Sequence, residues 1–279
     1  MKPTCAAILV THNSEAVIHK AIKCLREQTQ PFDQIIIVDS GSKDTAYLEQ
    51  YQDEPSMGVI LEGDDIGFCR GNNVGMQYVN FYSDYVVFIN PDAFVESDFL
   101  ERASEFMERS ENSRVGIFTP MLLGYDMTRD QPTGFYDSTG IFRTWYGRWY
   151  DRDQGQPCSK KKYGQTEHVP AICGALMFCR KKALDEILLR GQEVFDNTFY
   201  MYKEDIDLSQ RMREKGWNLM FVPDQVAYHC RGWMKDRSKM PRKFRLSSAR
   251  NDFRVNRRMG LLGMLYSTVK YAAVKWFNM

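Results

Sequence analysis

Apolar residues in this chain gather in short runs that end abruptly on small polar residues or carboxylates. The runs are rich in β-branched and aromatic residues and lack polar alternation, which predicts strands buried on both faces. They lie at residues 5–10, 34–38, 57–61, 85–89, 115–119, 173–179, 219–222 and 226–229. Helical spacing of apolar residues follows Ser14, which is suited to cap a helix. Strand, helix and strand of these lengths form βαβ units, so we expect an α/β fold with a mostly parallel sheet.

The central apolar run, residues 85–89, stops on Asn90, Pro91 and Asp92. Pro91 has no N–H for a ladder, so the strand must end there and Asp92 is left at its carboxyl end. Asp39 has the same place after the second strand. In open parallel α/β sheets ligands bind at this edge. A carboxylate there suits a hard divalent cation that carries a phosphorylated ligand.

The segment 63–75 contains glycines at intervals of four, together with two asparagines. This pattern predicts a loop whose backbone approaches a ligand before a helix begins. An ordinary turn and helix cap is an equally good interpretation of the same residues.

Glu204 and Asp205 begin a predicted helix that Gly216 would terminate. The helix macrodipole favours carboxylates at this end, which would explain both residues without catalysis. The alternative is that they provide a general base.

An aromatic-rich, glycine-punctuated stretch of about fifty residues follows residue 119, and Trp145 lies within it. The aromatic residues are either a satellite of the core or a wall for a sugar or lipid-linked acceptor, and the sequence does not decide between them. His12 and His168 are expected to be structural residues.

The chain has 279 residues, of which 43% are hydrophobic, enough for a sizeable core. Its 37 basic and 36 acidic residues nearly cancel, so no overall charge argues for a nucleic-acid partner. The seven cysteines form no Cys-x-x-Cys pair, and no apolar segment reaches the approximately 20 residues of a membrane span. We therefore expect reduced thiols and a cytoplasmic protein.

Charge is concentrated near the C-terminus, where about a dozen lysines and arginines lie between Lys235 and Lys275. An apolar stripe at helical spacing accompanies them, formed by Leu261, Leu262, Leu265, Val269, Ala272, Ala273 and Trp276. A basic amphipathic helix of this kind suits the inner surface of an anionic cytoplasmic membrane. The alternative is a helix docked on its own domain or in a homodimer.

Six motifs in order resemble the signature of the large inverting family 2 of glycosyltransferases, over about residues 4–232. They are Ile8–Ser14, Val38–Asp44, Asn73–Gly75, Asn90–Asp92, Glu204–Arg211 and Val226–His229. The resemblance implies the GT-A fold, a Rossmann-like, doubly wound, mostly parallel sheet. It implies a glycosyltransferase domain at 1–232, with a nucleotide-binding half at 1–120 and an acceptor half at 121–232, before a basic helical tail at 233–279.

The resemblance also implies roles for individual residues. Asp39 would bind the pyrimidine base, and Thr11, Asn13, Asp65, Asn73 and Asn90 would line the nucleotide-sugar site. Asp92 would bind Mg²⁺ or Mn²⁺, with His229 completing the metal shell. The family often has Asp where this chain has Asn90, which places strict metal dependence in question.

For the chemistry, we predict Asp205 as the base of a single displacement, with Glu204 as the second candidate. Trp145 and Arg211 are candidates for acceptor contact, although Arg211 could equally be a solvated helical arginine. The Asn-Pro-Asp variant resembles rhamnosyltransferases, which implies deoxythymidine diphosphate rhamnose (dTDP-rhamnose) as donor and a glycan or polyprenyl-linked acceptor of the cell envelope. A UDP-sugar enzyme of the same fold and a non-catalytic nucleotide-sugar-binding scaffold remain the alternatives. A nucleotidyltransferase would need a Gly-rich phosphate loop with Lys or Arg after the first strand, which residues 11–14 lack.

Overall fold

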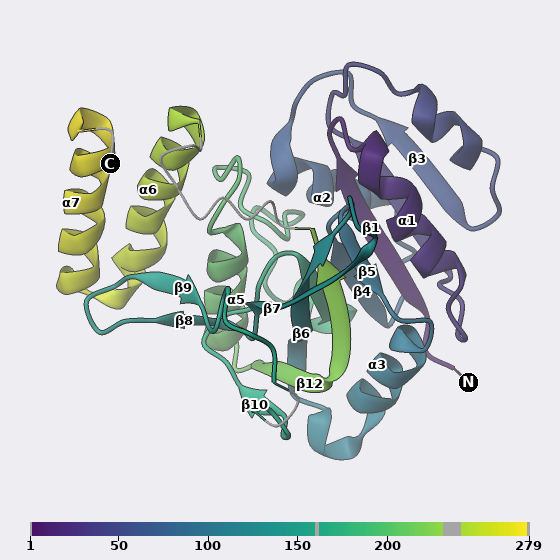
Figure 1. Ribbon diagram of the computed structural model, residues 1–279. Coiled ribbons are helices and arrows are strands. Elements are labelled where there is room, and N and C mark those ends of the chain that lie inside the picture. The colour runs from purple at the N-terminus through teal and green to yellow at the C-terminus, as the bar shows by residue number, and fades with distance from the viewer. Residues whose placement is uncertain (1, 160–161, 231–240, 278–279) are drawn as a thin grey trace.

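A computed structural model describes residues 2–159, 162–230 and 241–277, and it is built around one large mixed sheet (Figure 1). The order of hydrogen-bonded strands is β10-β12-β6-β11-β4-β1-β2-β3, with β5 paired to β12 and β7 paired to β6. The strands are β1 (Cys5–Thr11), β2 (Gln34–Asp39), β3 (Met57–Leu61), β4 (Tyr85–Ile89), β5 (Ala93–Val95), β6 (Val115–Asp126), β7 (Gln131–Ser138), β10 (Glu167–His168), β11 (Leu176–Arg180) and β12 (Asn218–His229). A separate hairpin consists of β8 (Ile141–Arg143) and β9 (Trp149–Asp151).

Helices alternate with the strands in the first part of the chain and follow them in the last. The α-helices are α1 (Glu15–Arg26), α2 (Gly67–Tyr78), α3 (Phe99–Glu108), α4 (Lys181–Asp185), α5 (Glu204–Glu214), α6 (Arg242–Asn256) and α7 (Leu261–Phe277), and short 3-10 helices include η1 (Ala46–Tyr51), η2 (Ser110–Asn112) and η4 (Arg257–Met259). The α/β fold and its mostly parallel sheet are confirmed.

The parallel core of the sheet fixes one ligand-binding edge. β1 pairs in parallel with both β2 and β4, and β2 pairs in parallel with β3. Thr11 and Asp39 are register partners at the ends of β1 and β2. Parallel strands end on the same edge, so these residues and Asn90, which follows β4, share one rim of the sheet.

Two predicted boundaries were wrong because pairing extends strands past the apolar runs. β6 continues to Asp126, and β12 runs through both short runs that were predicted as separate strands, with an irregularity between Val222 and Val226. Tertiary pairing with β6 over most of its length holds β12 together across this irregularity.

Segment 63–75 contains the predicted turn into a helix, and α2 already begins at Gly67. Gly71 and Gly75 lie inside the helix and allow it to approach β1. A Cβ added to Gly71 would lie 2.6 Å from Val10 Cγ1, and one added to Gly75 would lie 2.6 Å from Ile8 Cγ2. These two glycines therefore serve helix-to-sheet packing, not ligand approach.

α6 and α7 lie side by side at the end of the molecule opposite β3 and α1 (Figure 1). Their helical character agrees with the predicted C-terminal pattern. The predicted boundary at 232–233 lies outside the described residues. Among the described residues, no helix is both long and apolar enough to cross a membrane.

Candidate active site

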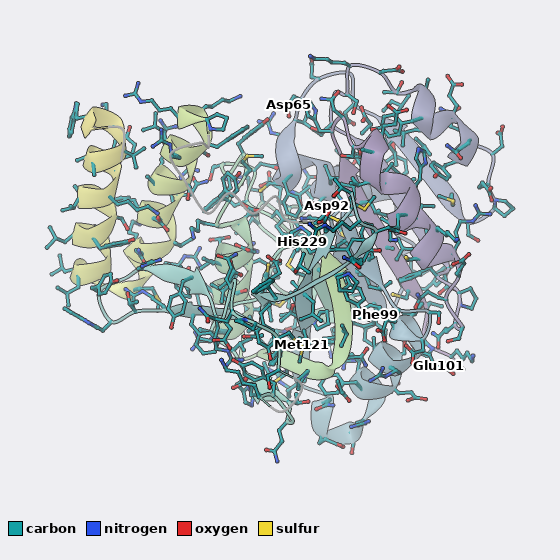
Figure 2. The ribbon with its side chains drawn as sticks, in the orientation of Figure 1. Asp65, Asp92, Phe99, Glu101, Met121 and His229 are labelled. Atoms are coloured by element: carbon teal, nitrogen blue, oxygen red, sulfur yellow. The ribbon has the colours of Figure 1, made fainter. Side chains whose placement is uncertain are left out.

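Asp92 and His229 meet because β12 pairs antiparallel with β5. His229 is the register partner of Ala93, and the N–H of Cys230 donates to the Asp92 carbonyl at 2.9 Å. The side chains then approach one another, with His229 Nε2 3.2 Å from Asp92 Oδ1. Figure 2 shows the two residues next to each other near the centre of the molecule, with Asp65 further toward the top. Asn90 completes this group, since its Nδ2 lies 3.3 Å from His229 Nε2.

The other ring nitrogen of His229 faces a third residue, Asp137 of β7. Nδ1 lies 2.8 Å from Asp137 Oδ2, and both side chains are buried. Burial alone would lower the pKa of His229, but Asp92 and Asp137 outweigh burial and raise that pKa to about 9. The imidazole is therefore held in one orientation between two carboxylates.

These residues fit a divalent cation. Two ligands about 2.1 Å from an octahedral ion are about 3 Å apart, close to the separation of Asp92 Oδ1 and His229 Nε2. A histidine that binds a metal commonly gives its second N–H to a carboxylate, as His229 can to Asp137. No group of three or more His, Cys, Asp or Glu residues suited to a metal occurs in the described parts of the chain. Asp92 and His229 would hold such an ion from the protein side, and phosphate oxygens and water would supply its other ligands.

Sequence reasoning missed Asp137. It lies in the aromatic-rich stretch, where the residues around it carry no motif, and only the fold brings it to His229. The stretch around Asp137 is buried, with Tyr136 and Ser138 on either side. An unpaired buried carboxylate is strongly disfavoured, so an acidic residue in such a stretch indicates a buried partner.

Replacing Asp137 should weaken metal binding without removing a metal ligand. We expect Asp137→Asn to lower Mn²⁺ affinity by about 10–100-fold, because the variant lacks the charge that orients His229 and increases its basicity. Calorimetry of Mn²⁺ in the presence of nucleotide would measure this. The exposed Asp98→Asn serves as matched control, and an unchanged affinity in Asp137→Asn, with the fold intact by circular dichroism, would contradict the assignment.

The turns that follow β1 and β2 carry the residues predicted to bind the nucleotide. Asp39 is buried and accepts hydrogen bonds from the N–H of Ser42, at 2.9 Å, and from its hydroxyl. Asn13 ties the two turns together, since its N–H donates to Ser42 Oγ at 2.7 Å and its side-chain oxygen accepts from the N–H of Lys43 at 2.9 Å. Thr11 is buried with its hydroxyl 3.1 Å from that of Tyr47. The contacts of Thr11, Asn13 and Asp39 with a nucleotide stay predictions.

Asp65 links the nucleotide side to the segment before α5. The Ser40 hydroxyl donates to it at 3.4 Å, and the Tyr200 hydroxyl donates to its other oxygen. Gly67 makes this possible, because it has φ +75° and a Cβ there would lie 2.6 Å from the Tyr200 ring. Burial and Asp65 raise the pKa of Tyr200 to about 12, so the phenol stays protonated as a donor. Tyr200 was not predicted from the sequence.

The side-chain amide of Asn73 is hydrogen-bonded within the protein. Its side-chain oxygen accepts from the N–H groups of Val194 and Phe195, at 2.9 and 3.0 Å, and its Nδ2 donates to the Phe195 carbonyl at 2.7 Å and to Asn197 Oδ1 at 2.9 Å. The amide is thus fully used in fixing the segment that leads to α5. A direct donor contact by Asn73 stays a prediction, and the geometry gives it a positioning role.

The predicted catalytic pair begins α5 after two residues in the left-handed region. Tyr202 has φ 70° and Lys203 has φ 74°, a conformation that non-glycine residues adopt only when surrounding contacts impose it. Asn251 of α6 supplies two of these contacts, since its Nδ2 donates to the carbonyls of Met201 and Tyr202 at 3.0 and 2.9 Å. Lys203 Nζ lies 3.8 Å from the buried Asp252 of the same helix.

Asp205 is half-buried and contacts the loop at residues 174–175, which also contacts Asn90 near Asp92. The Gly174 N–H donates to its Oδ2 at 3.1 Å, and the Ala175 carbonyl accepts from the N–H of Asn90 at 2.9 Å. Residues 174–175 therefore separate the carboxylate of Asp205 from the strand end that carries Asp92. Burial raises the pKa of Asp205, while Lys203 opposes that shift. A carboxylate of raised pKa that is open on one side is suited to accept a proton.

Glu204 is more buried than Asp205, and its Oε2 has no hydrogen-bond partner among the described residues. Burial first, and then Asp205, raise its pKa from 4.5 to about 8. Burial and the neighbouring carboxylate therefore both favour the neutral form of Glu204, which is unfavourable for a base. The geometry favours Asp205 over Glu204 for proton removal.

The raised pKa of Glu204 predicts a pH dependence of stability. Its contribution is fully present below pH 4.5, where the carboxyl is neutral in both states, and is lost as pH rises toward 8, because only the unfolded chain then releases the proton readily. Relative to Glu204→Gln, we expect wild type to lose on the order of 3–4 kcal/mol of unfolding free energy between pH 5 and 8, or roughly 6–16 °C in melting temperature. Parallel melting curves of the two proteins across this range would contradict the shift.

Arg211 is not the solvated helical arginine that was considered. It is buried, its Nε donates to Asp207 Oδ2 at 2.8 Å, and its Nη1 and Nη2 donate to the carbonyls of Ile187 and Val194 at 2.8 and 2.6 Å. These contacts fix the segment before α5 and leave the predicted acceptor contact unsupported. Trp145 lies in the turn of the β8–β9 hairpin and is 79% exposed; its acceptor role stays a prediction.

Comparison with known proteins decides the family. Residues 6–188 match the family described as Glycosyl transferase family 2. The chain belongs to this family. It is 26% identical over 231 residues to rhamnosyltransferase WbbL of Escherichia coli (strain K12), covering 80% of this chain and 81% of that protein. It is 21% identical over 242 residues to the N-acetylglucosaminyl-diphospho-decaprenol L-rhamnosyltransferase of Mycobacterium tuberculosis, covering 80% of this chain and 74% of that protein.

Solved structures confirm the predicted GT-A fold. GalNAc-T7 with UDP, GalNAc and Mn²⁺ aligns with a TM-score of 0.69 at 16% identity, over 91% of this chain and 48% of that one. The mannosyltransferase PcManGT from Pyrobaculum calidifontis, in complex with GDP-Man and Mn²⁺, aligns with a TM-score of 0.61 at 15% identity, over 99% of this chain and 76% of that one. The family match, not these structures, confirms the prediction of a glycosyltransferase. Both of the solved complexes contain Mn²⁺.

Proposed function

We propose that this glycosyltransferase transfers L-rhamnose from dTDP-rhamnose to a glycan or polyprenyl-linked acceptor for a cell-surface polysaccharide, at the cytoplasmic side. The observation that carries the reaction is the placement of Asp205 across residues 174–175 from the Asp92 and His229 pair. The two rhamnosyltransferase relatives, each aligned over 80% of this chain, support the choice of donor.

In this proposal, one group of residues binds the donor and Asp205 activates the acceptor. The donor diphosphate lies at the carboxyl edge of β1, β2 and β4, with Asp39 directed to the base and Asp92 and His229 available to hold Mg²⁺ or Mn²⁺. When bound, that ion offsets the charge that develops on the leaving diphosphate. Asp205 takes the proton of the acceptor hydroxyl while the oxygen of that hydroxyl attacks the anomeric carbon of the donor sugar. The bond to the diphosphate oxygen breaks as the new glycosidic bond forms, so a single displacement inverts the configuration.

Donor choice can be tested by calorimetry and thermal shift with dTDP-rhamnose, UDP-glucose, UDP-N-acetylglucosamine and GDP-mannose, each with and without Mn²⁺. We expect dTDP-rhamnose to bind at least tenfold more tightly than the others, and more tightly with Mn²⁺. A preference for a UDP sugar would replace rhamnose but keep the family and the site. If the folded protein bound no donor at all, the result would favour a non-catalytic scaffold.

A further inference from the structure

The inner face of α7 packs against the rest of the protein, whereas no described residue covers its outer face. On the inner face, Gly263, Ser267 and Val274 are buried against α6 and the β8–β9 turn, and Asn256 Nδ2 donates to Ser267 Oγ at 2.9 Å. The outer residues Leu261, Leu262, Leu265, Val269 and Trp276 are each between 56% and 84% exposed. At 3.6 residues per turn these five fall within an arc of about 100°, which makes one continuous apolar stripe.

The β8–β9 turn extends this stripe. The rings of Tyr146 and Tyr266 are 5.4 Å apart, and Trp145 packs edge-on against Tyr146 at 5.5 Å. Trp145 is 79% exposed beside α7. A second exposed indole is thus joined to the apolar stripe, from a segment more than a hundred residues earlier in the chain.

The two helices that carry this face are rich in positive charge. Residues 242–277 contain nine lysines and arginines and a single acidic residue, Asp252, which is buried and bound to Lys203 and Lys270. Arg257 precedes the stripe and is exposed, and Lys275 is exposed at the other end, beside Trp276. An apolar helical face with tryptophan at its edges and a cationic border matches the surface of an anionic bilayer.

We infer that the outer face of α7, together with Trp145, docks this protein onto an anionic lipid bilayer. A second copy of the chain fits this face less well. A two-fold interface places the same patch on both sides, so the cationic borders of the two copies would face each other. The inference goes beyond the proposed function, because it does not depend on which sugar is transferred.

Docking through α7 would also fix the orientation of the active site. α6 contacts α7 along its length and binds the segment before α5 through Asn251 and Asp252. Asp252 lies between Lys270 of α7 and Lys203, the residue immediately before Glu204 and Asp205. The bilayer-facing helix and the catalytic helix are therefore parts of one connected structure.

Vesicle flotation of the full chain tests the inference. We expect at least tenfold more wild-type protein to float with vesicles of phosphatidylglycerol and phosphatidylethanolamine than with phosphatidylcholine vesicles, and 0.5 M salt to reduce the bound fraction. Leu261→Glu/Leu265→Glu should lower binding to the anionic vesicles at least tenfold. Both side chains are exposed, so the fold should be retained, as circular dichroism and donor binding would verify.

A matched control is Phe81→Glu, which places the same charge on a 91% exposed aromatic residue outside the α7 face. It should bind vesicles as wild type does. The inference is overturned if wild type fails to float with anionic vesicles, or if the double variant floats equally well. It is also overturned if wild type dimerises in solution without binding vesicles and the double variant is monomeric, which would make this face a homodimer interface.

Discussion

Asp205→Asn should reduce transfer by about 10²–10⁴-fold while leaving donor binding within about twofold of wild type. The amide has nearly the shape of the carboxylate and can still accept from the Gly174 N–H, so the local structure should persist. It cannot take the acceptor proton. Steady-state transfer rates, together with calorimetry of the nucleotide sugar, separate the two effects.

Glu204→Gln is the informative comparison for Asp205→Asn. Glu204 is buried and its raised pKa favours the neutral form, so replacing it should change the rate much less than replacing Asp205 does. If Glu204→Gln abolished transfer and Asp205→Asn retained it, the two roles would have to be exchanged. Near-normal turnover in both variants would exclude the pair as the source of the base.

Asp92→Asn should abolish the part of donor binding that depends on Mn²⁺, with a loss of about 100-fold or more in transfer. The carboxylate is the charged ligand nearest to His229, and Asn90 adds no charge that could replace it. Calorimetry of the nucleotide with and without Mn²⁺ measures the coupling between metal and donor directly.

The matched control for Asp92→Asn is again the exposed Asp98→Asn, which removes one carboxylate elsewhere on the surface. It should leave both binding and transfer unchanged. If Mn²⁺ strengthened nucleotide binding in Asp92→Asn as much as in wild type, the metal would have to bind elsewhere.

The sequence was sufficient for the parts of the fold that depend on local pattern. Apolar runs that end on polar residues or carboxylates predicted β1, β2 and β4, and so placed Asp39 and Asp92 on one rim. The glycines of segment 63–75 show where such reasoning fails. A glycine that allows close packing, such as Gly71, has the same sequence appearance as one that admits a ligand, and only the approach of Val10 distinguishes them.

The residues that were missed are connected to the site by pairing between distant strands and helices. Asp137 reaches His229 across 92 residues. Tyr200 reaches Asp65 across 135 residues, and Asn251 reaches Tyr202 from the C-terminal helices. Their neighbours in the sequence contain no motif, because their partners are set by the tertiary fold. The same holds for Arg211, which the helical pattern alone could not place inside the protein.

The most direct test of the account is a transfer reaction with dTDP-rhamnose, Mn²⁺ and a polyprenyl-linked glycan acceptor, with the product analysed by nuclear magnetic resonance. We predict a rhamnosylated product whose anomeric configuration is opposite to that of the donor, formed by wild type but not by Asp205→Asn. Retention of the donor configuration would contradict a single displacement with Asp205 as base.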